Sequence, residues 1–221
     1  MDHPLLNTHD YSVAQLILFG VAAAYWIWVY IVVVIDIFKY KFVGIPALAI
    51  CANFAWEFLW SFKFYTNMGS LFEWGYRCWF VLDVFIFYSL FRYGKIQFSD
   101  ALLKRKFSLI VIFALLAWIC AIYAFTIRYP DPIGAVSAYL VNTNMSAIYI
   151  LLILKFPLEK SLSISTAWHK MLGTALTSVF CFWVFPHEYF MLVLAVITFV
   201  LDIVYIYLVT KLKRQSAYDA I

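Results

Sequence analysis

The chain has 221 residues, of which 66% are apolar and 13% charged, and its formal net charge at pH 7 is +4. Soluble globular domains are usually about 45–50% apolar and about 25% charged, so the composition excludes an ordinary soluble domain and also a disordered or fibrous chain. The basic residues are dispersed and form no nucleic-acid-binding pattern. The lipid bilayer is therefore the predicted environment, and the sequence points to no protein partner.

Seven apolar stretches are each long enough to form a helix across a hydrocarbon core of about 30 Å, which takes about 20 residues. The sequence predicts one integral membrane domain over residues 1–221, an all-α bundle of seven transmembrane helices. The predicted spans are residues 12–36, 43–62, 74–91, 107–127, 133–154, 168–185 and 190–210. The connections between them are too short to hold a soluble domain.

The distribution of Lys and Arg predicts the orientation of the bundle. Thirteen of the 16 basic residues lie at or near the connections on one side, with Lys170 counted at the start of the sixth span. Cytoplasmic connections carry the excess of Lys and Arg in membrane proteins. The N-terminus is thus predicted to be outside or lumenal and the C-terminus cytoplasmic, in a bacterial cell membrane or the endoplasmic reticulum.

Ionisable groups inside spans are the candidate functional residues, because each costs about 2.5–3.5 kcal/mol on insertion scales. Three carboxyl residues lie far inside predicted spans: Glu57, Asp83 and Asp202. Residues three or four apart share a helix face, which gives each carboxyl aromatic or amide neighbours. The predicted stripes are Asn53–Trp56–Glu57–Trp60, Trp79–Asp83, Tyr139–Asn142–Ser146–Tyr149 and Thr198–Asp202–Tyr205. Stripes that face inward would form one pocket with polar groups and aromatic walls.

Structural roles stay open for several of these polar residues. Buried Asn and Ser often only join helices, at about 0.6 kcal/mol per hydrogen bond, and Asn144 and Ser146 fit that role equally well. Asp83 can hydrogen-bond a neighbouring helix or pair with Arg77. Lys170 is expected at the cytoplasmic interface.

The residue types favour acid chemistry over metal or nucleophile chemistry. The sequence has no HExxH motif, histidine cluster, aspartate-rich run or P-loop, and its four cysteines have no CxxC spacing. No metal or cofactor is therefore predicted. Burial favours the neutral form of a carboxyl group, which can then act as a general acid. Aromatic ring faces stabilise a cation by about 2 kcal/mol when water is excluded, and the missing water protects a carbocation from capture. These properties predict a cyclisation of an isoprenoid that is started by protonation.

Five short motifs, in order along the chain, carry a resemblance to a known family. They are Asn53-Phe54-Ala55-Trp56-Glu57, Trp79 with Leu82-Asp83, Tyr139-Leu140-Val141-Asn142 with Met145-Ser146, Lys170-Met171-Leu172-Gly173-Thr174, and Leu201-Asp202. In these motifs the chain resembles the small seven-span integral membrane terpene cyclases of fungal meroterpenoid and indole-diterpene pathways and their bacterial relatives.

The resemblance implies that Glu57 and Asp202 are the two catalytic acids, one as proton donor and the other as its support or as proton acceptor. It also implies a metal-independent cyclase of the isomerase or lyase type, acting on a terminal epoxide of a prenyl chain with an aromatic head group. The residues implied in substrate binding are Asn53, Trp56, Trp60, Trp79, Asp83, Tyr139, Asn142, Ser146 and Tyr205. Ser137-Ala138-Tyr139 stands where fungal relatives carry a more polar Gln-Trp, so a simpler isoprenoid without an epoxide also fits.

Two other readings of the sequence remain open. A seven-span small-molecule transporter would also use intramembrane carboxyls, but the Pro-Gln motif of the sugar carriers of this kind is missing from spans 1 and 5. A non-catalytic receptor or assembly subunit would not need two intramembrane acids flanked by aromatic rings.

Overall fold

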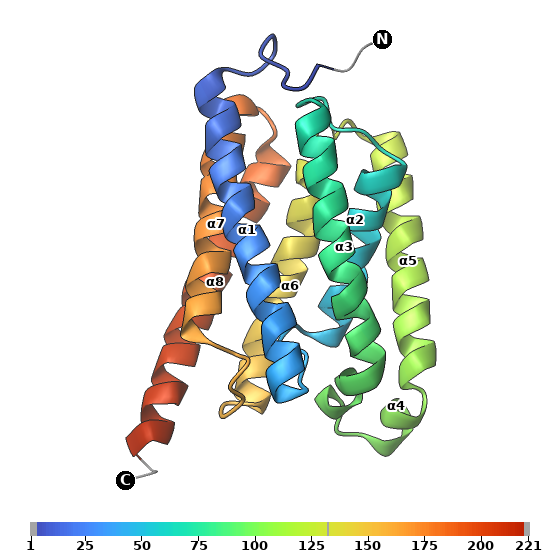
Figure 1. Cartoon of the computed structure of the whole chain (residues 1–221), viewed down its shortest axis with the longest axis vertical. Helices are drawn as coiled ribbons and strands as arrows, with labels where there is room; N and C mark the ends of the chain where they lie inside the picture. The colour runs from blue at the N-terminus through green and yellow to red at the C-terminus, as the bar shows by residue number, and fades with distance from the viewer. Residues whose placement is uncertain (1–3, 132, 219–221) are drawn as a thin grey trace.

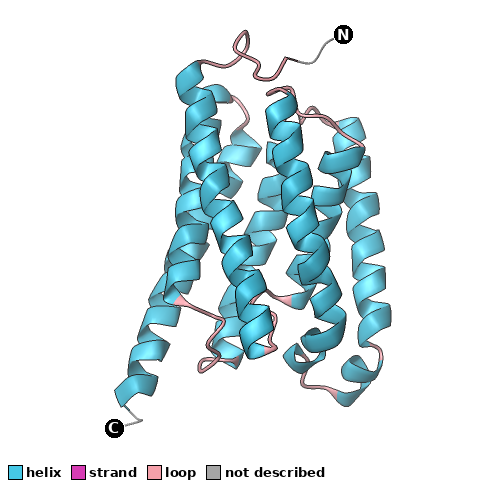
Figure 2. Ribbon diagram, in the orientation of Figure 1, coloured by secondary structure: helices cyan, strands magenta, loops and turns pink. Residues whose placement is uncertain are grey.

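The computed structural model describes residues 4–131 and 133–218, with side chains as far as Gln215, and all regular secondary structure in this part of the chain is helical (Figure 2). The long helices are α1 (Val13–Tyr40), α2 (Ala47–Phe62), α3 (Ser70–Tyr93), α5 (Phe107–Arg128), α6 (Ala135–Lys155), α7 (Ile164–Val184) and α8 (Tyr189–Tyr218). The 3₁₀ helix η1 (Gly94–Gln97) and the short helix α4 (Ala101–Arg105) connect α3 to α5.

Local sequence sets where the helices start. Ser12 and Gln15 form a capping box at α1, in which the Ser12 Oγ accepts from the Gln15 N–H and the Gln15 Oε1 accepts from the Ser12 N–H. The Ser163 hydroxyl accepts from the Thr166 N–H at 3.1 Å and starts α7 at Ile164. This start is four residues before the predicted span, so Lys170 lies in the second turn of α7 rather than at its beginning.

Six of the long helices form a closed ring. In the order α1, α3, α2, α6, α8 and α7, each helix packs against the next, and α7 packs back against α1 (Figure 1). Helix α5 stands outside the ring, against α2. The interior of the ring is therefore walled by helices that are far apart in the sequence.

The helices carry the features of a membrane bundle. By length and composition, α1, α5, α6 and the Tyr189–Gln215 segment of α8 can cross a membrane, and α2 is a shorter apolar helix. Large apolar side chains cover the outer surface, among them Val81 (68% exposed) and Phe113 (72% exposed). The all-helical prediction is confirmed for the described residues, whereas the crossing of all seven long helices remains a prediction.

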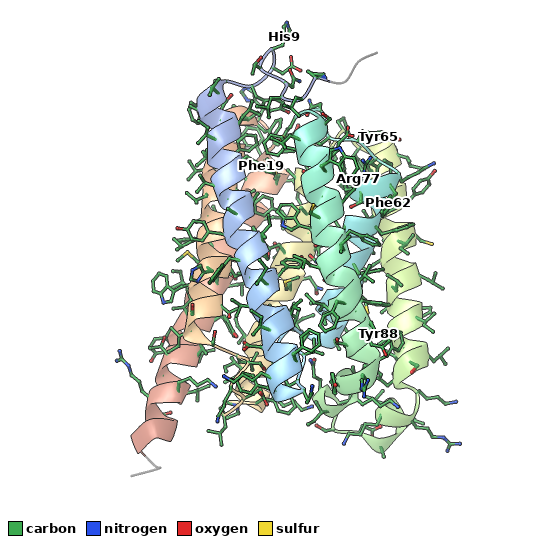
Figure 3. The ribbon with its side chains drawn as sticks, viewed as in Figure 1. His9, Phe19, Phe62, Tyr65, Arg77 and Tyr88 are labelled. Atoms are coloured by element: carbon green, nitrogen blue, oxygen red, sulfur yellow. The ribbon has the colours of Figure 1, made fainter. Side chains whose placement is uncertain are left out.

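Basic segments gather at one end of the bundle. The α1–α2 connection, η1 with α4, the α6–α7 connection and the end of α8 all lie at the lower end in Figure 1. Two lysines link these segments by hydrogen bonds. The Lys155 Nζ, at the end of α6, donates to the Gln97 carbonyl of η1 at 2.6 Å. The Lys213 Nζ, near the end of α8, donates to the Glu159 carbonyl in the α6–α7 connection at 2.5 Å. His9 stands at the opposite end (Figure 3). This asymmetry is the one that the orientation prediction requires, and the orientation itself stays a prediction.

Candidate active site

A cavity of about 120 Å³ lies inside the ring of helices. It reaches from Ile133, in the α5–α6 connection, to Met145 in the middle of α6, and Phe19 near the start of α1 also borders it (Figure 3). Helices α1, α2, α3, α6 and α7 supply the walls. The aromatic lining residues are Phe19, Trp26, Tyr30, Trp56, Tyr76, Trp79 and Tyr139, and the polar ones, besides the tyrosines and tryptophans, are Asn53, Glu57, Asn142, Thr174 and Thr177. The cavity is thus a ring-walled chamber whose described lining contains one carboxyl residue, Glu57.

Glu57 belongs to a hydrogen-bonded cluster from three helices. The Tyr30 hydroxyl, on α1, donates to the Glu57 Oε1. The Asn53 Nδ2, one turn earlier on α2, lies 2.9 Å from the same oxygen, 2.6 Å from the Tyr30 hydroxyl and 3.1 Å from the Asp83 Oδ2 on α3. Glu57 is 2% exposed and Asp83 is 1% exposed. One amide group therefore bridges two buried carboxyl groups.

The Glu57 carboxyl forms no ion pair with the described residues, and neither does that of Asp83. The Glu57 Oε2 is buried and has no hydrogen-bond partner among the described side chains. The Tyr30 hydroxyl and the Asn53 amide can bring at most three protons to the two carboxyl groups, and none of their hydrogen bonds reaches the Glu57 Oε2. The arrangement suits a carboxyl group that keeps its proton until a bound molecule takes it.

Asp202 lies in a second, separate cluster. The Lys170 Nζ, on α7, lies 2.7 Å from the Asp202 Oδ1 on α8 and 2.7 Å from the Ser146 hydroxyl on α6. The Lys170 and Asp202 side chains are 4% and 3% exposed. Neither residue lines the cavity, but the Lys170 Nζ is 5.7 Å from the centroid of the Trp26 ring, and Trp26 does line it. The ion pair therefore stands behind the Trp26 ring, which we call the Trp26 wall because it borders the cavity and lies against Lys170.

Two sequence-based expectations are corrected by these contacts, and a choice between two alternatives is decided for Asp83. Lys170 is buried rather than interfacial, because α7 starts at Ile164 and carries Lys170 inside the bundle. Asp83 is hydrogen-bonded to Asn53 on α2, while the nearest acidic partner of Arg77 is Glu73 at 4.0 Å.

The second correction concerns the two predicted acids. Glu57 and Asp202 do not line one cavity together, since Glu57 faces the chamber and Asp202 is on the far side of Lys170. Helix α8 contacts α6 and α7, and none of its side chains as far as Gln215 lines the cavity, so Asp202 meets Lys170, which also bonds Ser146 on α6.

The remaining predicted site residues also divide into those that line the cavity and those that do not. Asn53, Trp56, Trp79, Tyr139 and Asn142 line the cavity, whereas Trp60, Asp83, Ser146 and Tyr205 do not. Trp60 stacks on Trp56 with ring centroids 6.1 Å apart, and Tyr205 packs against Tyr149 at 5.1 Å. Trp60 therefore supports the Trp56 ring from behind, whereas Tyr205 packs against a residue that does not line the cavity.

The α5–α6 connection fixes the Trp56 ring. The Trp56 Nε1 lies 2.9 Å from the Ser137 hydroxyl and 3.2 Å from the Gly134 carbonyl. Gly134 has φ +73°, and a Cβ there would lie 2.7 Å from the Trp60 ring and 2.8 Å from the Trp56 ring. A glycine is therefore required for both its backbone conformation and the close approach of two indoles.

Asp131 completes the same connection. Its carboxyl accepts from the Val136 N–H at 3.0 Å, the Ser137 N–H at 3.1 Å and the Ser137 hydroxyl at 2.7 Å. Burial raises the pKa of the Asp131 carboxyl, and the hydrogen bonds from Ser137 and Val136 oppose that rise. Asp131 thereby caps the start of α6, on which Tyr139 and Asn142 stand.

Besides the Glu57 Oε2, two polar atoms of lining residues are left for a bound molecule. The Asn142 Nδ2 donates to the Thr174 hydroxyl at 3.1 Å, which leaves the Asn142 Oδ1 without a partner among the described residues. The Trp79 Nε1, which is also buried, is unpartnered within the same part of the chain. One acceptor and one donor can therefore meet polar groups of a ligand.

Sequence reasoning missed the contribution of α1 and part of α3. Tyr30, which bonds Glu57, and Trp26, which lies against Lys170, are both aromatic residues in an apolar span whose one acidic residue, Asp36, stands at its far end. The one signal is their spacing of four residues, which places both rings on one helix face. Tyr76, three residues before Trp79, follows the same rule.

The described residues contain no group of three or more His, Cys, Asp or Glu that could hold a metal ion.

Comparison with known proteins decides the family. The profile of the Pyr4-like transmembrane terpene cyclases matches residues 4–215. The chain belongs to the Pyr4-like transmembrane terpene cyclases. This Pyr4-like chain is 23% identical over 204 residues to the Pyr4-family terpene cyclase mfmH of Annulohypoxylon moriforme, which covers 86% of the chain and 83% of that relative. No solved structure matches it.

Family membership gives the cavity a chemical context. As a Pyr4-like cyclase with several apolar helices, the chain is a multi-pass membrane protein of terpenoid biosynthesis, and cyclisation of a terpene is the activity that its family supports. The resemblance drawn from the five sequence motifs is confirmed at the level of the family.

Proposed function

We propose that this protein is an acid-initiated, metal-independent terpene cyclase in which Glu57 donates the proton that starts ring closure. The observation that carries the proposal is the position of Glu57: its Oε2 is unpartnered among the described residues, and its side chain borders a chamber walled by aromatic rings. A carboxyl group away from water and from cations holds its proton, and it can protonate a substrate placed against it.

The proposed reaction conserves all atoms of the substrate. Glu57 protonates the oxygen of a terminal epoxide, or the terminal alkene of a chain without an epoxide. The epoxide C–O bond breaks, or the alkene becomes a cation, and successive double bonds attack to form the carbon–carbon bonds of fused rings. Transfer of a proton from carbon to the Glu57 carboxylate ends the cascade and restores the acid, so substrate and product are isomers, and the enzyme is of the isomerase or lyase type.

Aromatic faces supply the stabilisation that the cation needs. Trp26, Tyr30, Trp56, Trp79 and Tyr139 come from four helices and border the same space. A ring face from which water is excluded stabilises a cation by about 2 kcal/mol. Because several rings line the cavity, each could stabilise the positive charge at a different stage of the cascade. The Asn142 Oδ1 and the Trp79 Nε1 would orient the polar head group of a prenylated substrate.

Asp202 is proposed to take part in the same reaction without contacting the substrate. Its carboxyl group is paired with Lys170 behind the Trp26 wall, so we give the role of proton donor to Glu57 alone. We also propose that all seven long helices cross the bilayer, with the N-terminus outside or lumenal and the basic end cytoplasmic.

A substrate panel tests the proposed function. Purified protein in nanodiscs is incubated with a farnesyl-phenol that carries a terminal epoxide, with the same compound without the epoxide, and with farnesol, and products are separated by mass and retention time. New isomeric cyclic products from at least one compound, absent with heat-inactivated protein, are the expected result. Uptake of an unchanged compound into proteoliposomes, without any cyclic product, would instead support the transporter reading.

A further inference from the structure

Lys170 is a buried cation that faces the aromatic wall of the proposed cyclisation chamber. Its Nζ lies 5.7 Å from the centroid of the Trp26 ring, and Trp26 borders the cavity. A cyclisation cascade develops positive charge in that cavity, and like charges repel strongly where the surroundings are apolar. An uncompensated ammonium group at this place would therefore oppose the reaction that the chamber serves.

The motif from Lys170 to Thr174 explains why the ammonium comes so close. A Cβ at Gly173 would lie 2.8 Å from the Trp26 Cδ1 and 3.0 Å from its Nε1, so the indole packs directly against the α7 backbone. Lys170, one turn before Gly173, then reaches the same indole. Thr174 follows on this face, lines the cavity and accepts from Asn142.

Asp202 is the counter-charge of this lysine. Its Oδ1 lies 2.7 Å from the Lys170 Nζ, and its side chain is 3% exposed. Asp202 is not among the lining residues of the cavity, so the described geometry gives it no direct route for handing a proton to a bound chain. Its Oδ2 is buried and has no hydrogen-bond partner among the described residues, so the contact of Oδ1 with Lys170 is the hydrogen-bonded link between Asp202 and the Trp26 ring.

We propose that Asp202 is a positioning residue that cancels the charge of Lys170 behind the Trp26 wall, rather than a group that exchanges protons with the substrate. The inference rests on the proposed cyclase function and refines the role of its second acid. It follows that the ion pair as a whole is replaceable by a neutral pair, whereas loss of Asp202 alone is not tolerated. A buried ion pair is often replaceable by apolar residues of similar volume, but removal of one partner leaves a costly lone charge.

The test compares Asp202→Asn, Lys170→Met and the double variant Lys170→Met/Asp202→Asn in nanodiscs. Lys211→Met is the matched control, because Lys211 is exposed and also lies over a ring, 5.9 Å from the centroid of Tyr207. We expect cyclisation by Asp202→Asn to fall by about a hundredfold, and the double variant to return to within about tenfold of the wild-type rate. Thermal melting and gel filtration report folding of each variant independently of activity.

The outcome for the double variant decides the inference even if Asp202→Asn does not fold. Recovery of cyclic product in the double variant supports charge compensation, because that variant has no carboxyl group at position 202. A folded double variant without cyclic product would show that the carboxyl itself is needed, and a double variant that does not fold would show that the pair is not replaceable; either result overturns the inference. Absence of product from the wild-type protein on the whole panel would instead count against the proposed function.

Discussion

Tyr30 on α1 donates a hydrogen bond to the carboxyl of Glu57 on α2. The two residues are 27 positions apart in the sequence, and both border the cavity. A hydrogen bond to this oxygen stabilises the carboxylate that remains after Glu57 has given up its proton. Tyr30 therefore supports proton donation while its ring forms part of the wall.

Tyr30→Phe should slow cyclisation by about tenfold and leave substrate affinity nearly unchanged, because the ring stays and only the hydroxyl is lost. Rates and KM values of the two proteins in nanodiscs check this expectation. Tyr88→Phe is the matched control, since Tyr88 is 63% exposed on α3 (Figure 3). A Tyr30→Phe enzyme as fast as the control would show that the hydroxyl plays no part.

Trp79 tests the role of the aromatic wall. Its ring lines the cavity and stacks on Tyr76, with centroids 5.7 Å apart. Trp79→Leu should reduce the cyclisation rate by roughly tenfold to thirtyfold, whereas Trp79→Phe should keep most of it, because the stabilisation comes from a ring face. Trp74→Leu, at an exposed position of the same helix, is the control. Equal losses in the Leu and Phe variants would argue against cation stabilisation.

Gly134→Ala should destabilise the protein. A residue with a Cβ pays about 1–2 kcal/mol in the left-handed conformation, and the new methyl would meet the Trp56 and Trp60 rings within 2.8 Å. A melting midpoint lower by about 4–8 °C is expected from a loss of about 2 kcal/mol. Gly20→Ala is the control, because a Cβ there meets nothing within 4 Å, and its midpoint should not fall.

Asp131 predicts a pH dependence of stability. Its pKa in the folded protein is raised above the ordinary value of 3.8, chiefly by burial, so its contribution to stability is fully present below about pH 4 and is lost as the pH rises through the raised pKa. The melting midpoint of the wild type, taken relative to that of Asp131→Asn, should therefore be higher near pH 4 than near pH 8. A difference that grows with pH would contradict the predicted direction.

The sequence was informative where a residue is costly in a membrane. Glu57 and Asp83 stand out because carboxyl groups rarely occur in apolar spans, and helical spacing correctly put Asn53, Trp56 and Glu57 on one face that lines the cavity. The all-helical fold followed from the lengths of the apolar stretches. These features depend on single residues or on one helix at a time.

The order of helices around the ring could not be predicted from single residues or from spacing within one helix. The position of α1 between α3 and α7 brings Tyr30 to Glu57 and Trp26 to Lys170. The sequence of an apolar, aromatic span does not predict either contact. The depth of Lys170 depends on the Ser163 cap, which starts α7 before its apolar stretch. The pairing of Asp202 with Lys170 likewise depends on how α8 packs against α7, and residue spacing within one helix cannot predict a contact between two helices.

The most direct test of the account is a single-turnover measurement with Glu57→Gln, on the compound that the wild type cyclises. Gln keeps the size of Glu57 and can still accept from Tyr30, but it has no acidic proton to give, and Glu188→Gln in the exposed α7–α8 connection is the matched control. The account predicts that Glu57→Gln binds the substrate and forms cyclic product at least about a hundredfold more slowly than the wild type. Cyclisation by Glu57→Gln at the rate of the control would contradict it.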